Sequence, residues 1–168
     1  MGRMAIRIIN KQYVKNNMDV KKKPLEENMY KEILENMPIC CVDVFVYKDR
    51  KYLLVKRDRE PEKGTYWFVG GRLFKNERFF DAARRKCIQE AGIEVKPKMV
   101  LGVFETFFEK DHFSSQSGTH SVNIQVIAEA LSDKIDLDGM HEDFTWKDFS
   151  EDPGNEYVAD IVKKSIEQ

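Results

Sequence analysis

A pair of glycines followed by a charged helical segment is the part of the sequence best suited to chemistry. Gly70 and Gly71 precede residues 77–91, which contain no glycine or proline and carry Glu90 near their end. Glycines let a backbone approach a ligand closely, so a carbonyl in this turn and the Glu90 carboxylate could share one hard cation. Magnesium takes oxygen ligands and often binds through one or two carboxylates together with substrate phosphates. The local chemistry therefore predicts a site for a metal ion and a diphosphate.

An ordinary strand, turn and helix with a charged outer face would carry many of the same residues. A glycine pair before a helix is a weak signal when it is taken alone. The combination of Gly71, Glu77, Arg85, Glu90 and Gly92 at fixed offsets is much more specific. It favours the functional interpretation of this segment over the purely structural one.

Hydrophobic periodicity and turn residues predict the elements that must position this segment. Apolar residues at helical spacing predict helices at 25–37, 77–91 and 156–165, and Gly92 suits the left-handed position after a helix. Runs of β-branched and aromatic residues predict strands at 39–47, 52–56, 65–69, 99–108, 122–130 and 144–148. Because the strands occur in pairs and also alternate with helices, we predict an α+β protein with a mixed sheet.

The composition indicates one soluble domain. The 168 residues include 28 basic and 29 acidic side chains, so no net charge attracts the chain to nucleic acid or to a membrane. No apolar run reaches the roughly 20 residues that span a bilayer, and no signal peptide is evident. The adjacent Cys40 and Cys41 are expected to be buried thiols in a reducing compartment. We therefore expect a cytoplasmic protein with a basic N-terminal arm at residues 1–23 and a single domain at residues 24–168.

The segment from Gly71 to Ile93 resembles the Nudix box, the signature of a superfamily of hydrolases. In that box a glycine, a glutamate and an Arg-Glu-apolar-x-Glu-Glu-x-Gly-apolar run recur at these spacings, and the matching residues are Gly71, Glu77, Arg85, Glu90, Gly92 and Ile93. Two acidic positions differ, since Lys86 and Gln89 stand where glutamates are usual. The resemblance implies the Nudix fold, a mixed β-sheet sandwiched between helices in three α/β/α layers.

The two departures have a geometric meaning. Residues 86, 89 and 90 share one face of a helix, where the usual box presents three carboxylates that can hold several metal ions. Here only Glu90 remains, and Lys86 adds positive charge beside it. One metal ion is therefore more plausible than two or three, and a simple ion pair between Lys86 and Glu90 is the structural alternative.

Loss of the same two acids is a feature of the GDP-mannose mannosyl hydrolase branch, which this chain resembles over roughly residues 26–148. The shared features are Arg72 after the glycine pair, Asp43 in a strand after Pro38, Lys56-Arg57 at the end of a strand, the aromatic run 64–71, the loop residues 107–113 and 118–120, and Met140-His141-Glu142-Asp143-Phe144-Thr145-Trp146. The branch is dimeric, so the resemblance also implies a homodimer.

The resemblance implies a single magnesium ion, with manganese as a substitute, held by the Gly70 carbonyl and by Glu90. In the branch a glutamine side chain also binds this metal, but Met140 occupies that position here. A thioether is a poor ligand for magnesium, so water or the neighbouring Glu142 would have to replace it.

The same resemblance assigns catalytic and binding roles. His141 matches a general base, and a histidine has a pKa suited to that role near neutral pH. Arg72 matches a residue that stabilises charge on the departing diphosphate, while Asp43 and Arg57 match positions that hold the substrate. The structural alternatives are a solvent-facing loop histidine and a buried Asp43 that only organises hydrogen bonds. His120 is a reserve candidate for the base.

Three functions remain open at this point. The first is hydrolysis of a nucleoside diphosphate sugar such as GDP-mannose at the anomeric carbon, which releases GDP and the free sugar. The second is conventional Nudix chemistry, in which water attacks phosphorus of a nucleotide sugar or a nucleoside triphosphate. The third is a Nudix-derived module that binds nucleotides without turnover, for which Met140 is the best support.

Overall fold

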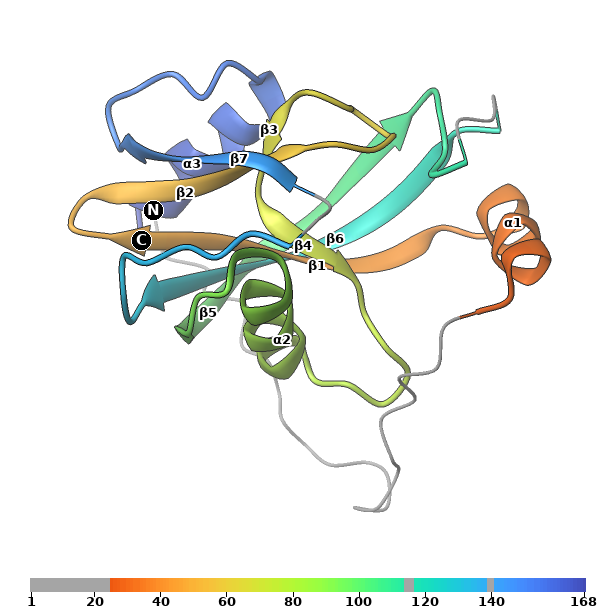
Figure 1. The fold of residues 1–168 in the computed structure, drawn as a ribbon, viewed down its shortest axis with the longest axis horizontal. Helices are drawn as coiled ribbons and strands as arrows, with labels where there is room; N and C mark the ends of the chain where they lie inside the picture. Colours follow the sequence, from red (N-terminus) through yellow and green to blue (C-terminus); the bar gives the residue numbers. More distant parts are fainter. Residues whose placement is uncertain (1–24, 114–116, 139–140) are drawn as a thin grey trace, which may run out of the picture.

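The part of the chain that the computed structural model describes comprises residues 25–113, 117–138 and 141–168. Within it the elements are, in order, α1 (Glu27–Asn36), β1 (Ile39–Lys48), β2 (Lys51–Arg57), β3 (Tyr66–Trp67), β4 (Val69–Arg72), α2 (Phe79–Ala91), β5 (Val95–Phe108), β6 (Thr119–Ala130), β7 (His141–Asp148) and α3 (Glu156–Ile166). Figure 1 shows their arrangement. The N-terminal arm predicted at residues 1–23 and Met140 lie outside the described residues.

The strands form one mixed sheet with the order β3-β2-β1-β6-β5, while β4 pairs with β1 and β7 pairs with β2. Strands β1 and β6 run parallel, and the other pairs are antiparallel. The central position of β1 gives it three partners along its length. The prediction of an α+β protein with a mixed sheet is therefore confirmed.

Side chains alternate between the two faces along a strand. Both faces of this sheet carry apolar side chains, and a helix covers each of them. On one face Val42, Val44 and Val46 of β1 pack with the buried Ala83 and Cys87 of α2. The opposite face carries a second core, in which the buried residues include Phe45, Tyr52, Leu54, Trp67, Phe68, Ile127, Val158, Ile161 and Val162. Val158, Ile161 and Val162 belong to α3. The sheet therefore lies between α2 and α3, as the Nudix resemblance implied.

Helix α1 contributes little to the core. Three of the apolar residues whose spacing predicted this helix, Leu25, Met29 and Met37, are exposed, and only Leu34 of the helix is buried. Figure 1 shows the reason, since α1 lies beyond the end of β1 and not over the sheet. Cys40 is exposed as well, so the expectation that it is a buried thiol was wrong, whereas its neighbour Cys41 is half-buried.

The strand predicted at residues 65–69 is in fact two short strands with different partners. Tyr66 and Trp67 pair with β2, and Val69 to Arg72 cross to pair with β1. The glycine pair thus belongs to β4 and not to a loop. Gly70 lies opposite Asp43, so closely that a Cβ on Gly70 would be 2.3 Å from the Asp43 Oδ1 atom. Glycine is required here because of this approach.

We expect the substitution Gly70→Ala to destabilise the fold. The added methyl group would also lie 2.7 Å from the Val42 carbonyl oxygen, which belongs to the sheet backbone and cannot rotate away. Overpacking of this kind costs about 1–3 kcal/mol of unfolding free energy. Urea denaturation of both proteins measures the loss. Gly102→Ala is the matched control, since its φ also lies outside the left-handed region and a Cβ there meets only the Phe104 side chain, at 3.1 Å, and no backbone atom; an equal loss in the two variants would contradict the packing argument.

Candidate functional site

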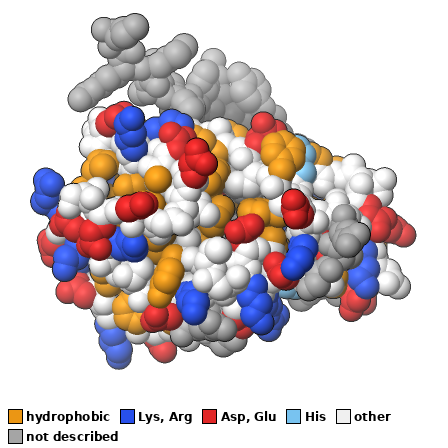
Figure 2. All heavy atoms as spheres, turned by 90° about the horizontal axis from the view of Figure 1, so that it is seen from above, with side chains coloured by type: hydrophobic (Ala, Val, Ile, Leu, Met, Phe, Trp, Pro, Cys, Tyr) orange, Lys and Arg blue, Asp and Glu red, His pale blue; other side chains and the backbone are white. Residues whose placement is uncertain are grey.

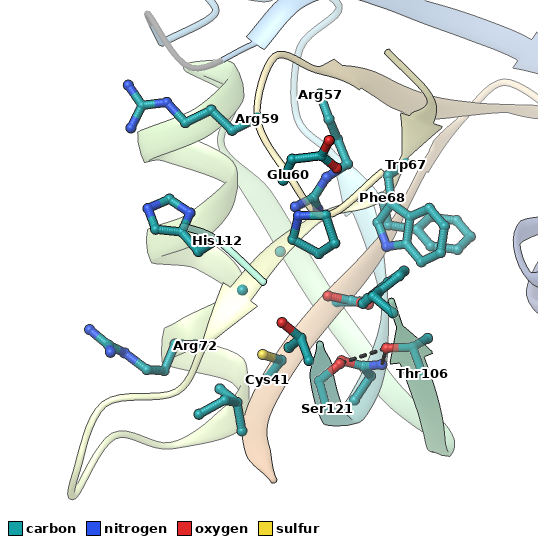
Figure 3. A pocket seen from close by; sticks show the side chains of 18 of the residues that line it. Cys41, Arg57, Arg59, Glu60, Trp67, Phe68, Arg72, Thr106, His112 and Ser121 are labelled. Carbon is teal, nitrogen blue, oxygen red and sulfur yellow. Dashed lines mark hydrogen bonds between the residues drawn. The ribbon is translucent and has the colours of Figure 1, made fainter. Parts of the chain in front are cut away.

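Five of the six predicted site residues line one cavity of about 290 Å³. They are Asp43 of β1, Arg57 of β2, Gly70 and Arg72 of β4, and Glu90 of α2. In Figure 3 Arg57 lies at the top of this cavity and Arg72 at its lower left, with Cys41 of β1 to the right of Arg72. The sheet pairing explains the convergence, because β1 lies beside β4 and the register places Asp43 opposite Gly70.

The Glu90 carboxylate lies between the glycine strand and a lysine. Its Oε2 accepts a hydrogen bond from the Gly70 backbone N–H at 3.0 Å, and its Oε1 lies 2.5 Å from the Lys86 Nζ. Both side chains are largely buried, with 8% of Glu90 and 17% of Lys86 exposed. The ion pair considered as the structural alternative for Lys86 is therefore present, but it lies in the cavity wall and not on the outer surface.

A second ion pair fixes the start of helix α2 against the glycine strand. Arg85 donates to both carboxylate oxygens of Glu77, from Nε at 2.6 Å and from Nη2 at 2.8 Å. The Arg85 guanidinium also donates to the Arg72 carbonyl at 3.2 Å. Glu77 precedes the helix, which begins at Phe79 and not at residue 77 as predicted. Gly92 follows it with φ of 60°, in the predicted left-handed conformation.

The donor set at Glu90 does not fit a resident magnesium ion in this arrangement. Magnesium takes oxygen ligands in near-octahedral geometry, yet each Glu90 oxygen already accepts from a nitrogen. A unit positive charge 4 Å from another costs about 4 kcal/mol at an effective dielectric constant of 20, so the Lys86 ammonium opposes a cation beside Glu90. In the described ranges, no three His, Cys, Asp or Glu side chains converge as ligands. The assignment of Gly70 and Glu90 to a metal stays a prediction.

Asp43 is a buried acid of the cavity whose pKa is shifted upward. Burial is the largest cause of the shift and raises the pKa of Asp43 to about 7, with a further increase from the Glu90 charge. The Arg57 charge and a hydrogen bond from Trp67 act in the opposite direction. An acid with such a pKa exchanges protons near neutral pH. Asp43 lines the cavity, and its role in substrate binding stays a prediction.

The two predicted arginines each present nitrogen atoms that make no hydrogen bond with the described residues. These are the buried Nε of Arg57 and the buried Nη1 of Arg72. The Arg72 guanidinium lies over the ring of Tyr30 from α1, 4.7 Å from its centroid, so a cation–π contact orients it. Unpaired guanidinium donors at a cavity suit the oxygen atoms of a phosphate or a carboxylate.

The three histidines differ in their relation to the cavity. His141 begins β7, and its backbone pairs with Arg57 at the cavity, but its side chain is outside the described part of the structure. His112, expected to be a loop residue, lines the cavity. His120, the reserve candidate, does not, and its Nε2 lies 3.2 Å from Glu105. The role of His141 as a base stays a prediction.

Sequence reasoning missed a wall of the cavity that carries hydroxyl and amide groups. Thr106 of β5 and Ser121 of β6 share a hydrogen bond of 2.6 Å, and Asn123 donates to the Thr106 hydroxyl at 3.1 Å (Figure 3). Tyr30 was missed as well. These residues are far apart in the chain. The sequence signal that could have indicated them is the presence of polar residues within otherwise apolar strands, where a buried polar group needs a partner.

Charged side chains of both signs are interspersed on the face shown in Figure 2, in keeping with the balance of acidic and basic residues. The described atoms of that face form no broad area of one sign. Among the helices of the described ranges, none is both long enough and apolar enough to cross a membrane.

A mixed sheet between two helices, with a glycine strand that contacts a helix glutamate, defines the Nudix class of domain. Comparisons with known proteins support this. The family described as "NUDIX domain" matches residues 37–160, so the chain belongs to the Nudix family. A MutT NUDIX hydrolase from Burkholderia pseudomallei has the same fold, with a TM-score of 0.64, 23% sequence identity, and coverage of 77% of this chain and 98% of that one.

Two curated relatives differ in what their names state. The chain is 27% identical over 127 residues to "Low-salt glycan biosynthesis protein Agl8" of Haloferax volcanii, which covers 76% of this chain and 81% of the relative. It is 33% identical over 102 residues to an ADP-ribose pyrophosphatase of Methanocaldococcus jannaschii, which covers 61% of this chain and 57% of that protein. The second match thus spans little more than half of the relative.

Proposed function

We propose that this chain hydrolyses a nucleoside diphosphate sugar, with GDP-mannose as the first substrate to test. Water attacks the anomeric carbon, the bond from that carbon to the diphosphate oxygen breaks, and the products are the nucleoside diphosphate and the free sugar. The leaving group is an anion, so donors placed to meet its charge accelerate the reaction. His141 is the proposed base that takes the proton of the attacking water.

The observation that carries this proposal is that one cavity contains two guanidinium groups with unused donors and a single carboxylate from the box helix. Arg57 and Arg72 both line the cavity with nitrogen atoms that no described residue accepts from, while Glu90 is the one acid at the three box positions of α2. Attack at phosphorus generally relies on several metal-binding acids, whereas departure of a diphosphate from carbon relies on charge stabilisation. The cavity is therefore better suited to stabilising a diphosphate that departs from carbon than to holding several metal ions.

The comparisons support the substrate class. Nudix hydrolases act on nucleoside diphosphate derivatives and generally use magnesium or manganese. The relative named for glycan biosynthesis agrees with a sugar nucleotide. The hydroxyl and amide wall formed by Thr106, Ser121 and Asn123 offers hydrogen bonds that suit the hydroxyl groups of a sugar. A homodimer and a cytoplasmic location stay predictions.

The second candidate is a diphosphatase that directs water to phosphorus. The observation in its favour is the relative named as an ADP-ribose pyrophosphatase, which is the more identical of the two curated relatives. The third candidate, a binding module without turnover, depends on Met140, which lies outside the described residues.

Hydrolysis in oxygen-18 water distinguishes the candidates. The protein is incubated separately with GDP-mannose and with ADP-ribose, with and without added magnesium, and the products are analysed by mass spectrometry. We expect the label on free mannose and unlabelled GDP. Label on GMP or on mannose 1-phosphate would establish attack at phosphorus and overturn the proposal. With an active control enzyme, an absence of turnover would favour the binding module.

The variant His141→Ala extends the same experiment. If His141 is the base, we expect turnover to fall by about 10²–10⁴-fold, which is the usual contribution of general base catalysis. Binding of GDP, measured by calorimetry, should be retained. His120→Ala is the matched control, since that side chain contacts Glu105 and does not line the cavity. Unchanged turnover in His141→Ala would exclude it as the base.

A further inference from the structure

Lys86 reaches the cavity from the middle of helix α2, one turn before Glu90. Residues four apart in a helix lie on the same face, and the Lys86 Nζ is 2.5 Å from the Glu90 Oε1. Both side chains line the cavity that also holds Arg57 and Arg72. The lysine is therefore placed to meet a bound anion as well as to pair with Glu90.

The glycine strand accommodates this lysine. Gly71 has φ of +135°, and a Cβ on it would lie 2.8 Å from the Lys86 Cε and 3.0 Å from the Nζ. The neighbouring Gly70 N–H donates to the other oxygen of Glu90. The ammonium group thus lies against the same two elements, the glycine strand and the Glu90 carboxylate, that a shared cation would contact.

The charges of the cavity favour an anion once local pairs are removed. Among the lining residues, Arg59 lies 3.8 Å from Asp58, and Glu60 pairs with a lysine outside the cavity, Lys110, at 3.0 Å. Among the lining residues that the structure describes, the remaining cations are Arg57, Arg72 and Lys86 and the remaining acids are Asp43 and Glu90, so one positive charge is in excess even though Lys86 pairs with Glu90. Lysine binds phosphate as a point charge and arginine through its fork of donors, so the three cations complement a diphosphate.

We propose that the Lys86 ammonium takes the place of a divalent cation beside Glu90, so that this chain binds the diphosphate of its substrate without a resident metal. This inference rests on the proposed function for the identity of the ligand, a nucleoside diphosphate. It also predicts that the tethered charge excludes a metal ion from Glu90 as long as the lysine is present.

Binding of Mn²⁺ tests the exclusion without any measurement of activity. Free Mn²⁺ is followed by electron paramagnetic resonance during titration of the wild type and of Lys86→Gln. Because removal of the ammonium relieves the repulsion of a nearby divalent ion, we expect the variant to bind Mn²⁺ at least about tenfold more tightly. Lys164→Gln is the matched control, since it removes a lysine that pairs with Asp160, four residues earlier, on the exposed side of α3. Equal, tight binding by the wild type and Lys86→Gln would overturn the proposal.

Binding of inorganic pyrophosphate in the presence of EDTA tests the replacement. We expect calorimetry to show binding to the wild type and a loss of at least about tenfold in affinity for Lys86→Gln, because one cation of the site is removed. Binding that requires added magnesium in the wild type would refute metal-free recognition. Thermal melts monitor folding, and Lys86→Met, which keeps the aliphatic chain packed on Gly71, repeats both titrations if the glutamine variant melts early.

The two proposals fail in different ways. If labelled-water experiments show no hydrolysis of nucleotide sugars while the Mn²⁺ and pyrophosphate results are as expected, the proposed function is wrong and the role of Lys86 stands. If hydrolysis occurs but the wild type binds Mn²⁺ tightly at Glu90, the role of Lys86 is wrong and the function stands.

Discussion

Replacement of Arg72 by alanine is expected to lower kcat by about 10²–10³-fold, the usual cost of removing one donor that stabilises transition-state charge. The structure holds this side chain ready for such a role. Its guanidinium is oriented by the Tyr30 ring, and its buried Nη1 makes no hydrogen bond with the part of the chain that the structure describes. A donor that is already oriented and unpaired needs little reorganisation when charge develops on the leaving group.

Steady-state kinetics on the substrate identified with labelled water measure this effect. Arg72→Lys should recover part of kcat, because it keeps the charge but loses the planar fork of donors. Arg84→Ala is the control, since Arg84 lies on the exposed side of α2, where it pairs with Asp81 and donates to the Phe80 carbonyl. An increase in KM with kcat unchanged would assign Arg72 to ground-state binding and contradict a role in departure of the diphosphate.

The parts of the site that sequence alone could predict are those encoded locally. Gly70, Arg72 and Glu90 belong to one strand, turn and helix, where residue offsets determine which groups meet. The hydrogen bond from Gly70 to Glu90 confirms that the strand and the helix glutamate come together. Asp43 and Arg57 lie on other strands, and only the resemblance to a family placed them with the box.

The parts that sequence could not predict depend on pairing and coverage between distant elements. Periodicity reports which residues share a face, but it does not report which face another element covers. The spacing of Leu25 and Met29 therefore predicted a helix, but it did not show that both side chains are exposed. The switch of partner between Trp67 and Val69 likewise depends on where β1 and β2 lie, which no local pattern encodes. The contribution of Tyr30 to the cavity has the same origin.

The ionisation of Asp43 is expected to make the fold less stable as the pH rises. The pKa of Asp43 is raised from 3.8 to about 7, chiefly by burial. Between these two values the native state binds more protons than the unfolded state, so the free energy of unfolding falls with increasing pH. At 1.36 kcal/mol per pKa unit, the loss is about 4 kcal/mol over the whole window, and more than half of it falls between pH 5 and pH 7.5.

The variant Asp43→Asn removes this loss because its side chain stays neutral while it can still accept the hydrogen bond from Trp67. Urea denaturation of both proteins at pH 5 and at pH 7.5 measures the difference in pH dependence. Asp81→Asn is the control, since that carboxylate is 61% exposed on α2. Parallel pH dependence in the wild type and Asp43→Asn would show that burial does not hold Asp43 neutral.

The protonation equilibrium of Asp43 also connects this residue to ligand binding. With its pKa raised to about 7, the Asp43 carboxyl titrates around neutral pH, so a small change in its surroundings alters its charge. A sugar hydroxyl that donates to the carboxylate would stabilise the ionised form, whereas a diphosphate nearby would stabilise the protonated form. Proton uptake or release on pyrophosphate binding, measured by calorimetry in buffers of different ionisation enthalpy, therefore tests whether Asp43 senses the anion. We expect uptake of protons by the wild type and a smaller uptake by Asp43→Asn, and equal values would place the diphosphate away from this carboxylate.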